Sequence, residues 1–257
     1  MTIYISPSEI KKRTHIKLST DKSHYLINVM RCRNGDTVSV IDGDGKAFQS
    51  KISSVRNGVV IIDILSEMIL DTEPLFNLIL CQGMIKGDKM DIVIQKATEL
   101  GIKKIIPIIT ERGIVRETRK LQRWQKIAEE AAEQCGRTVI PKVIEPVEIT
   151  QLLKSPGIIP EQSRFKGFIF WEEGGRSLSQ GIDEIISHHK KEVYPLQDIP
   201  IFIIIGPEGG LTAQEVMLAE EKGFIRTTLG KRLLKSETAS IIAVALIQFM
   251  LELGDEV

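Results

Sequence analysis

The sequence predicts an α/β protein with a small N-terminal β domain and a larger C-terminal domain built on a parallel sheet. Its 257 residues exceed the roughly 100–200 residues of one compact domain. Hydrophobic residues make up 42% and charged residues 26%, which is typical of soluble globular proteins and excludes disordered and fibrous classes. Turn-rich β-type runs fill the first 70 residues, whereas strands and helices alternate afterwards.

Short runs rich in β-branched residues predict the strands of the N-terminal domain. These strands are Thr37–Asp42, Ala47–Val55 and Val59–Leu65. Asp-Gly and Asn-Gly pairs separate them, and such pairs are strong hairpin signals because both residues tolerate positive φ. A short helix is expected before them at His24–Arg31, and the domain boundary falls between Ser66 and Pro74. We therefore predict domains at residues 1–70 and 73–257.

Apolar runs that suit strands buried on both faces recur in the second domain. They lie at Leu75–Gln82, Lys104–Ile109, Gly167–Trp171 and Ile199–Ile205. A helix is predicted at Asp88–Leu100, ending at Gly101, and another at Leu121–Cys135, where apolar residues recur at three- and four-residue steps. Strands that alternate with helices imply a parallel sheet.

The C-terminal segment Ser236–Leu253 predicts a helix capped by Ser236 or Thr238 and apolar nearly all round. Such a helix must be buried by a core or by another subunit, and we interpret it as too short to span a bilayer. The first residues contain no apolar run typical of a signal peptide. A cytoplasmic protein without membrane association is therefore expected.

The charge balance is neutral overall but uneven along the chain. The sequence holds 34 basic and 34 acidic residues, yet Lys86–Lys126 contains eleven basic against five acidic ones. Arg226–Lys235 contains four basic residues and no acidic one. These stretches either contact a polyanion or form the solvated faces of helices and loops.

The cysteines and histidines do not predict a metal site or a disulfide framework. Cys32, Cys81 and Cys135 are odd in number, widely spaced and outside any C-x-x-C pair. His188 and His189 are adjacent, and no ligand spacing accompanies them. We therefore expect neither a bound metal nor structural disulfides.

Two glycine-containing loops are the candidate functional elements. Gly206–Gly210 follows the strand Ile199–Ile205 directly, and Thr212 can cap the next helix. Thr228–Ala239 follows a short strand near Phe224 in the same way. In open α/β sheets, ligands bind beyond the carboxyl ends of strands, so the two loops together predict a cleft. Neither loop has a dinucleotide or P-loop phosphate motif.

These loops resemble a known family. IGPEGGLTAQE and LGKRLLKSETA resemble the GPEGG and LG-x-R-x-LR-x-ETA patterns of SPOUT RNA methyltransferases, within them the ribosomal RNA small subunit methyltransferase E family. Further segments that resemble this family are His24–Gly45, Lys86–Ile108, Glu111–Arg116 and Glu133–Val143. The resemblance covers nearly the whole chain. Lys235-Ser236 stands where the family more often has Arg-Thr, and lysine lacks the planar bidentate fork of arginine.

The resemblance implies a specific architecture and reaction. The C-terminal domain would be a SPOUT domain with a parallel sheet and a deep trefoil knot that binds S-adenosylmethionine. The N-terminal domain would be a PUA-like β-barrel that binds RNA. The protein would be a homodimer that methylates N3 of a uridine in 16S rRNA of the small ribosomal subunit.

The resemblance also implies roles for individual residues. The cofactor cleft would comprise Gly206, Pro207, Glu208, Gly209, Gly210, Leu229, Gly230, Leu234, Glu237, Thr238 and Ala239. The rRNA would contact Arg31, Arg112, Arg116 and Arg137. Arg232, or Arg137 of the partner subunit, would stabilise an anionic uracil, and Glu208 is a weaker candidate for a base. Core packing of the two leucines and plain surface charge for the arginines stay open as alternatives.

Two other functions compete with this one. A SPOUT-type enzyme could act on another RNA nucleoside, for instance on a ribose hydroxyl. Alternatively, the chain could be a non-catalytic dimeric RNA-binding protein with the C-terminal domain as a scaffold. The glycines in both loops argue against a scaffold, because a scaffold does not need close backbone approach there.

Overall fold

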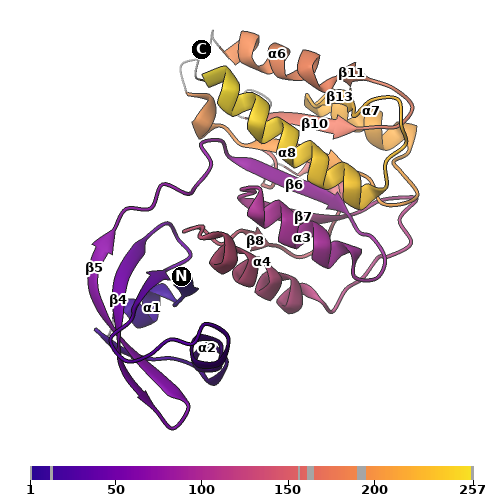
Figure 1. Cartoon of the computed structure of the whole chain (residues 1–257). Helices are drawn as coiled ribbons and strands as arrows, with labels where there is room; N and C mark the ends of the chain where they lie inside the picture. Colours follow the sequence, from indigo (N-terminus) through magenta and orange to yellow (C-terminus); the bar gives the residue numbers. More distant parts are fainter. Residues whose placement is uncertain (1, 12–13, 156, 161–164, 190–194, 256–257) are drawn as a thin grey trace. The chain divides into compact units, whose positions relative to one another are not determined.

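The computed structural model describes residues 2–11, 14–155, 157–160, 165–189 and 195–255. The chain forms two compact units (Figure 1). Residues 1–73 and 129–140 form the N-terminal unit, and residues 74–128 and 141–257 form the C-terminal unit. The division therefore passes through helix α4 (Leu121–Cys135), whose second half groups with the N-terminal unit. The domain limits predicted from the sequence place this segment in the C-terminal domain instead.

The N-terminal unit is built on a five-stranded sheet in the order β1-β3-β4-β5-β2. The strands are β1 (Thr2–Tyr4), β2 (His15–Lys17), β3 (Thr37–Ile41), β4 (Ala47–Arg56) and β5 (Val59–Met68). Neighbouring strands are antiparallel except β1, which lies parallel to β3. Asn57 and Gly58 have φ values of 50° and 74°, as the tight β4–β5 turn requires. The predicted hairpin is confirmed, whereas the sequence did not predict β1 and β2.

Short helices pack on this sheet. They are α1 (Pro7–Ile10), α2 (Thr20–His24) and the π-helical turn η1 (Tyr25–Val29). The helix predicted at His24–Arg31 therefore begins earlier, at Thr20. It changes from an α-helix to a π-helix after His24. Leu26, Val40 and Ile62 are fully buried in the apolar core between these elements.

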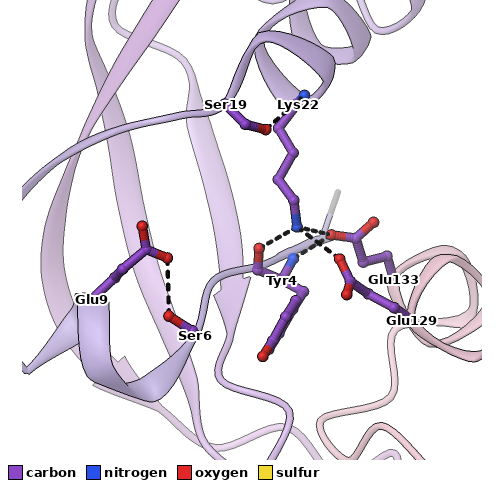
Figure 2. A network of polar contacts seen from close by, with 7 residues as sticks. All are labelled: Tyr4, Ser6, Glu9, Ser19, Lys22, Glu129 and Glu133. Carbon is purple, nitrogen blue, oxygen red and sulfur yellow. Dashed lines mark hydrogen bonds and ion pairs between the residues drawn. The ribbon is translucent and has the colours of Figure 1, made fainter. Parts of the chain in front are cut away.

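A polar network fixes the second half of α4 within the N-terminal unit (Figure 2). Lys22 Nζ on α2 lies 2.9 Å from Glu133 Oε1 and 3.2 Å from Glu129 Oε1, and it also donates to the carbonyl oxygen of Tyr4. The backbone N–H of Tyr4 donates to the Glu133 carboxylate. These charge-assisted bonds join α4 to β1 and α2.

The C-terminal unit holds an eight-stranded sheet in which every paired strand is parallel. The strand order is β11-β13-β10-β12-β6-β7-β8, and β9 also pairs with β7. The strands are β6 (Leu78–Gly83), β7 (Lys104–Ile109), β8 (Lys142–Val143), β9 (Val147–Glu148), β10 (Lys166–Phe170), β11 (Arg176–Ser177), β12 (Ile201–Ile205) and β13 (Ile225–Thr228). The predicted parallel α/β sheet is confirmed, and the trefoil knot stays a prediction.

Helices cover both faces of this sheet (Figure 1). They are α3 (Lys89–Glu99), the first half of α4, α5 (Ile149–Lys154), α6 (Leu178–His189), the 3-10 turn Leu196–Asp198, α7 (Ala213–Lys222) and α8 (Ser236–Asp255). α8 packs against α3, α6, β6 and β12, whereas α5 and α7 pack together in the core cluster on the opposite face. Ile79 and Cys81 of β6 belong to that cluster, while the alternate residue Gln82 contacts α8.

Helix α8 is longer than the sequence predicts and has two apolar faces. Ala243, Val244, Ile247 and Leu251 are buried, whereas Ile242, Leu246, Phe249 and Leu253 are 39–60% exposed. The window Ser236–Leu253 is long and apolar enough to cross a membrane by length and composition, so the expectation that it is too short is wrong. Within this structure, 39% of the window is buried, and the helix packs on the sheet.

Candidate active site

A cavity of about 510 Å³ lies at the carboxyl ends of β10, β12 and β13. Its lining comes from four elements: the start of α3, the end of β10, the loop after β12, and the loop after β13 that leads into α8. The lining residues are Lys89, Phe170, Trp171, Glu172, Ile205, Gly206, Pro207, Glu208, Gly210, Leu211, Thr228, Leu229, Gly230, Lys231, Arg232, Leu233, Leu234, Lys235, Ser236 and Ala239. The two loops predicted to form a cleft therefore do so.

Most residues predicted for the cofactor cleft line this cavity, with three exceptions. Gly209, Glu237 and Thr238 are not among the lining residues. The sequence analysis missed Lys89, Trp171 and Glu172, which do line it. Trp171 and Glu172 directly follow β10. Because ligands bind beyond the carboxyl ends of strands in open α/β sheets, their position after a predicted strand was a signal for them. Lys89 starts a helix, and its position has no comparable signal in the sequence.

Two glycines of the Gly206–Gly210 loop occupy positions where a side chain would be strained or would clash with neighbouring residues. A Cβ on Gly209 would lie 2.7 Å from the backbone oxygen of Arg112. Gly210 has φ of 70°, a backbone conformation that residues with a side chain rarely adopt. The missing side chain of Gly209 lets the Arg112 backbone approach the loop, and close approach of a ligand to Gly209 stays a prediction.

A buried hydrogen-bond network joins the two loops. Ser236 Oγ donates to the carbonyl oxygen of Gly206 at 2.6 Å and accepts from Gln82 Nε2 at 3.0 Å. Ser240 Oγ lies within hydrogen-bond distance of Gln82 Oε1 and of the carbonyl oxygen of Ser236, and its single proton is shared between these two acceptors. Gln82 and Ser240 are completely buried, and Ser236 is 7% exposed. The network therefore ties the start of α8 to β6 and to the first residue of the loop after β12.

Lys89 contacts acidic side chains of both loops. Its Nζ lies 3.5 Å from Glu208 Oε1 and 3.8 Å from Glu237 Oε1. Partial burial alone would raise the pKa of Glu208, but hydrogen bonds from its own backbone N–H, from the N–H of Lys86 and from Lys89 together lower it below its usual range. A lowered pKa makes this carboxylate a weaker proton acceptor, which weakens its candidacy as a base.

A buried polar atom without a partner lies just after β10, next to the cavity. Trp171 Nε1 is buried and has no hydrogen-bond partner among the described residues. The Arg226 guanidinium lies over the Trp171 ring, 5.6 Å from its centroid. Partly exposed Leu229 and Leu234 supply apolar walls, so they are not ordinary core residues. Apolar walls with few convergent polar groups are typical of small-molecule sites.

Three of the predicted arginines lie in the C-terminal unit. Arg232 is exposed and lines the cavity. Arg112 Nη1 donates to the carbonyl oxygen of Leu211 at 3.2 Å, which places this arginine beside the loop after β12. Arg116 is exposed, and its Nη2 donates to the carbonyl oxygen of Glu111 at 3.2 Å. The structure thus brings Arg112 and Arg232 to the two loops that form the cavity.

Arg31 and Arg137 belong to the N-terminal unit. Arg137 is 3% exposed, and its Nη2 donates to Glu73 Oε2 at 2.9 Å. Glu73 Oε1 also accepts from the backbone N–H groups of Thr138 and Val139, both at 2.9 Å. Arg137 therefore holds the chain after α4 in place, and its role in RNA binding stays a prediction. Arg31 is exposed and has φ of 58°.

The described residues contain no group of three or more His, Cys, Asp or Glu side chains that could hold a metal ion. Cys81 is buried, and Cys135 is exposed.

Two family models match the chain. Residues 71–248 match the RNA methyltransferase domain, and residues 18–65 match the RNA methyltransferase PUA domain. The first match spans the sheet and the cavity of the C-terminal unit, and the second spans most of the N-terminal sheet.

Relatives with one name match nearly the whole chain. The chain is 30% identical to the ribosomal RNA small subunit methyltransferase E of Bacillus subtilis, covering 99% of this chain and 98% of the relative. It is 31% identical to the protein of that name from Synechocystis, covering 97% and 78%. The solved structure of the Neisseria gonorrhoeae protein of that name, bound to S-adenosyl methionine, is 32% identical, with a TM-score of 0.81 over 97% of each chain.

Proposed function

Because this chain belongs to the ribosomal RNA small subunit methyltransferase E family of RNA methyltransferases, we propose that it methylates N3 of a specific uridine in 16S rRNA. The methyl donor in this proposal is S-adenosylmethionine. The main support for this proposal is the cavity between the two glycine-containing loops. Ser236 joins these loops through its hydrogen bond to Gly206.

The residues of the cavity fit this donor. S-adenosylmethionine supplies an electrophilic methyl group on a positively charged sulfonium. The lining combines the carboxylates of Glu172 and Glu208 with the cations Lys89, Lys231, Arg232 and Lys235, so it offers partners for both the sulfonium and the carboxylate of this donor. Leu229 and Leu234 would contact its apolar parts, and the Trp171 indole N–H is a buried donor for a polar atom. The relative from Neisseria gonorrhoeae binds this compound, which supports the proposal.

The chemical requirement at the target base assigns roles to the charged residues. N3 of uracil carries a proton, and its lone pair is delocalised, so this proton must leave before or during methyl transfer. Arg232 at the rim of the cavity would stabilise the negative charge that develops on the uracil carbonyl oxygens. Glu208 is a weak base because its pKa is lowered. The burial of Arg137 argues against its action from a partner subunit.

We also propose a cytoplasmic homodimer. Ile242, Leu246, Phe249 and Leu253 recur at three- and four-residue steps and form an exposed apolar stripe on α8. Burial of such a stripe against a second copy would remove it from water. Phe249→Glu should then yield monomers in analytical ultracentrifugation, and an unchanged dimer would contradict this location of the interface.

The experiment that tests the reaction compares rRNA from a strain with and without this protein. Nucleoside mapping should show that one N3-methyluridine of 16S rRNA is lost and is restored by the wild-type gene. Loss of a different methylated nucleoside would support the SPOUT enzyme with another target. No lost modification, combined with no S-adenosylmethionine binding in calorimetry, would support the non-catalytic RNA-binding alternative.

A further inference from the structure

Leu233 is an apolar side chain at the mouth of the cavity with little protein around it. It is among the residues that line the cavity, yet it is 82% exposed. Leu229 and Leu234 of the same loop are only partly exposed. Single exposed leucines are common on protein surfaces, so a role for Leu233 depends on its position and its neighbours.

The loop that carries Leu233 is fixed at both ends. After β13, the Gly230 N–H donates to Thr228 Oγ1 at 3.3 Å, and Thr228 Oγ1 donates to the carbonyl oxygen of Gly230 at 3.2 Å. At the other end, Ser236 Oγ donates to the carbonyl oxygen of Gly206 at 2.6 Å. A short segment anchored on both sides therefore holds Leu233 at the cavity, which lowers the entropy cost of a contact with a ligand.

Cations flank Leu233 along this loop. Lys231, Arg232 and Lys235 are exposed and line the same cavity. The sequence contains no acidic residue between Arg226 and Lys235. The loop therefore attracts phosphates, and a polyanion that its cations bind also comes into contact with Leu233.

An aliphatic side chain contacts the faces of bases or sugars in an RNA, because it has no group that binds a phosphate. In a stacked strand, neighbouring bases cover these faces. N3 of uracil lies on the pairing edge between two carbonyl groups, so the target uridine must leave its stack to bring N3 to a methyl donor in the cavity. Its departure uncovers the face of the neighbouring base at the mouth of the cavity, where Leu233 lies.

We propose that Leu233 is a wedge that enters the gap left by the target uridine and keeps this uridine in the cavity. Apolar side chains that enter base steps act in this way in other nucleic-acid-binding proteins. The inference rests on the proposed function, because it takes a uridine of rRNA as the methyl acceptor. It assigns Leu233 to recognition of the substrate, whereas the charged residues of the cavity act on the base itself.

The test uses 16S rRNA from a strain that lacks this protein, rebuilt by ligation with 2-aminopurine on the 3′ side of the mapped target uridine. This base analogue fluoresces more strongly when it is unstacked. Wild-type protein should raise the fluorescence, and Leu233→Ala should abolish most of this rise. The variant should also methylate the RNA about tenfold more slowly, since burial of the leucine side chain in the complex is lost. S-adenosylmethionine affinity and the log–log salt slope of RNA binding should not change, because neither depends on an apolar contact with a base.

Leu233→Met keeps a long apolar side chain and should restore both the fluorescence rise and most of the rate. Ile69→Ala is the matched control, because Ile69 is an aliphatic residue that is 96% exposed outside the cavity. This control should behave like the wild type.

Three results would overturn the wedge and leave the proposed function standing. They are a wild-type rate in Leu233→Ala, a slow rate with an undiminished fluorescence rise, and methylation by the wild-type protein without any fluorescence rise. If the wild-type protein methylates neither this RNA nor unligated 16S rRNA, the proposed function fails, and the wedge fails with it.

Discussion

The Ser236 hydroxyl donates a 2.6 Å hydrogen bond to the carbonyl oxygen of Gly206 and so joins the start of α8 to the loop after β12. The same oxygen accepts from Gln82 Nε2 at 3.0 Å. Because both loops line one cavity, this single hydroxyl helps to set its width.

Ser236→Ala should therefore weaken S-adenosylmethionine binding about tenfold and lower stability. The substitution leaves Gly206 and Gln82 without this partner, and an unsatisfied buried polar group costs about 1–3 kcal/mol. Calorimetry with S-adenosylmethionine and thermal unfolding measure the two effects. Ser236→Thr, which keeps the hydroxyl, is the control and should bind like the wild type. Wild-type affinity in Ser236→Ala would show that the loops do not depend on this bond.

Arg137→Ala should destabilise the protein by about 3 kcal/mol, because it leaves the Glu73 carboxylate without its guanidinium partner in a largely buried site. Urea unfolding measures the loss. Glu73→Gln should cause a smaller loss, since the amide oxygen still accepts from the backbone N–H groups of Thr138 and Val139. Normal stability together with lost RNA affinity in Arg137→Ala would restore this residue to the RNA-binding set.

Gly209→Ala should weaken S-adenosylmethionine binding by moving the loop after β12. Its Cβ would meet the Arg112 backbone oxygen at 2.7 Å, and a backbone atom cannot turn away as a flexible side chain can. Gly58→Ala is the control: Gly58 has a positive φ of 74°, which Gly209 does not, but a Cβ on Gly58 meets nothing within 4 Å. The control should lose stability without losing affinity. Equal affinity in both variants would contradict this role for Gly209.

Local patterns predicted the regular elements well. The predicted limits of Lys104–Ile109 and Leu121–Cys135 agree with β7 and α4, because apolar periodicity and polar flanks mark both ends. The capping box between Thr212 and Glu215 also forms as a local pattern suggests. The strands β1 and β2 have only three residues each, which is too short to show the alternation of apolar and polar residues that predicts a strand.

Contacts between distant residues could not be predicted in this way. Lys22 and Glu133 are 111 residues apart, and nothing in either local sequence indicates that they pair. Arg137 belongs to a residue type that is almost always exposed, so its burial depends on Glu73, which is 64 residues away. Lys89 meets Glu208 across a similar separation. These pairs decide which predicted site residues are structural and which line the cavity.

Glu208→Gln should change the pH dependence of stability in acid and leave the pH dependence of methylation unchanged near neutrality. The folded-state pKa of Glu208 lies below its ordinary value of 4.5, so its ionised form stabilises the fold above that pH. This contribution is lost as pH falls through the folded-state pKa. The stability difference between wild type and variant should therefore be present at pH 7 and shrink below about pH 4.5. A methylation profile between pH 6 and 9 that shifts in the variant would instead make Glu208 the base.

Arg232→Ala should slow the methyl-transfer step about a hundredfold, the usual effect of removing one group that stabilises a developing anion. Its effect on S-adenosylmethionine affinity should be small, because the charge that Arg232 meets appears on the uracil and not on the donor. Single-turnover methylation of rRNA, followed across pH, separates the two quantities. The wild-type rate should rise with pH as the imide proton becomes easier to remove.

Lys231→Ala is the matched control, since Lys231 is the adjacent exposed cation on the same loop. Equal slowing in both variants would indicate general attraction of RNA, and a wild-type rate in Arg232→Ala would assign stabilisation of the anion to another residue.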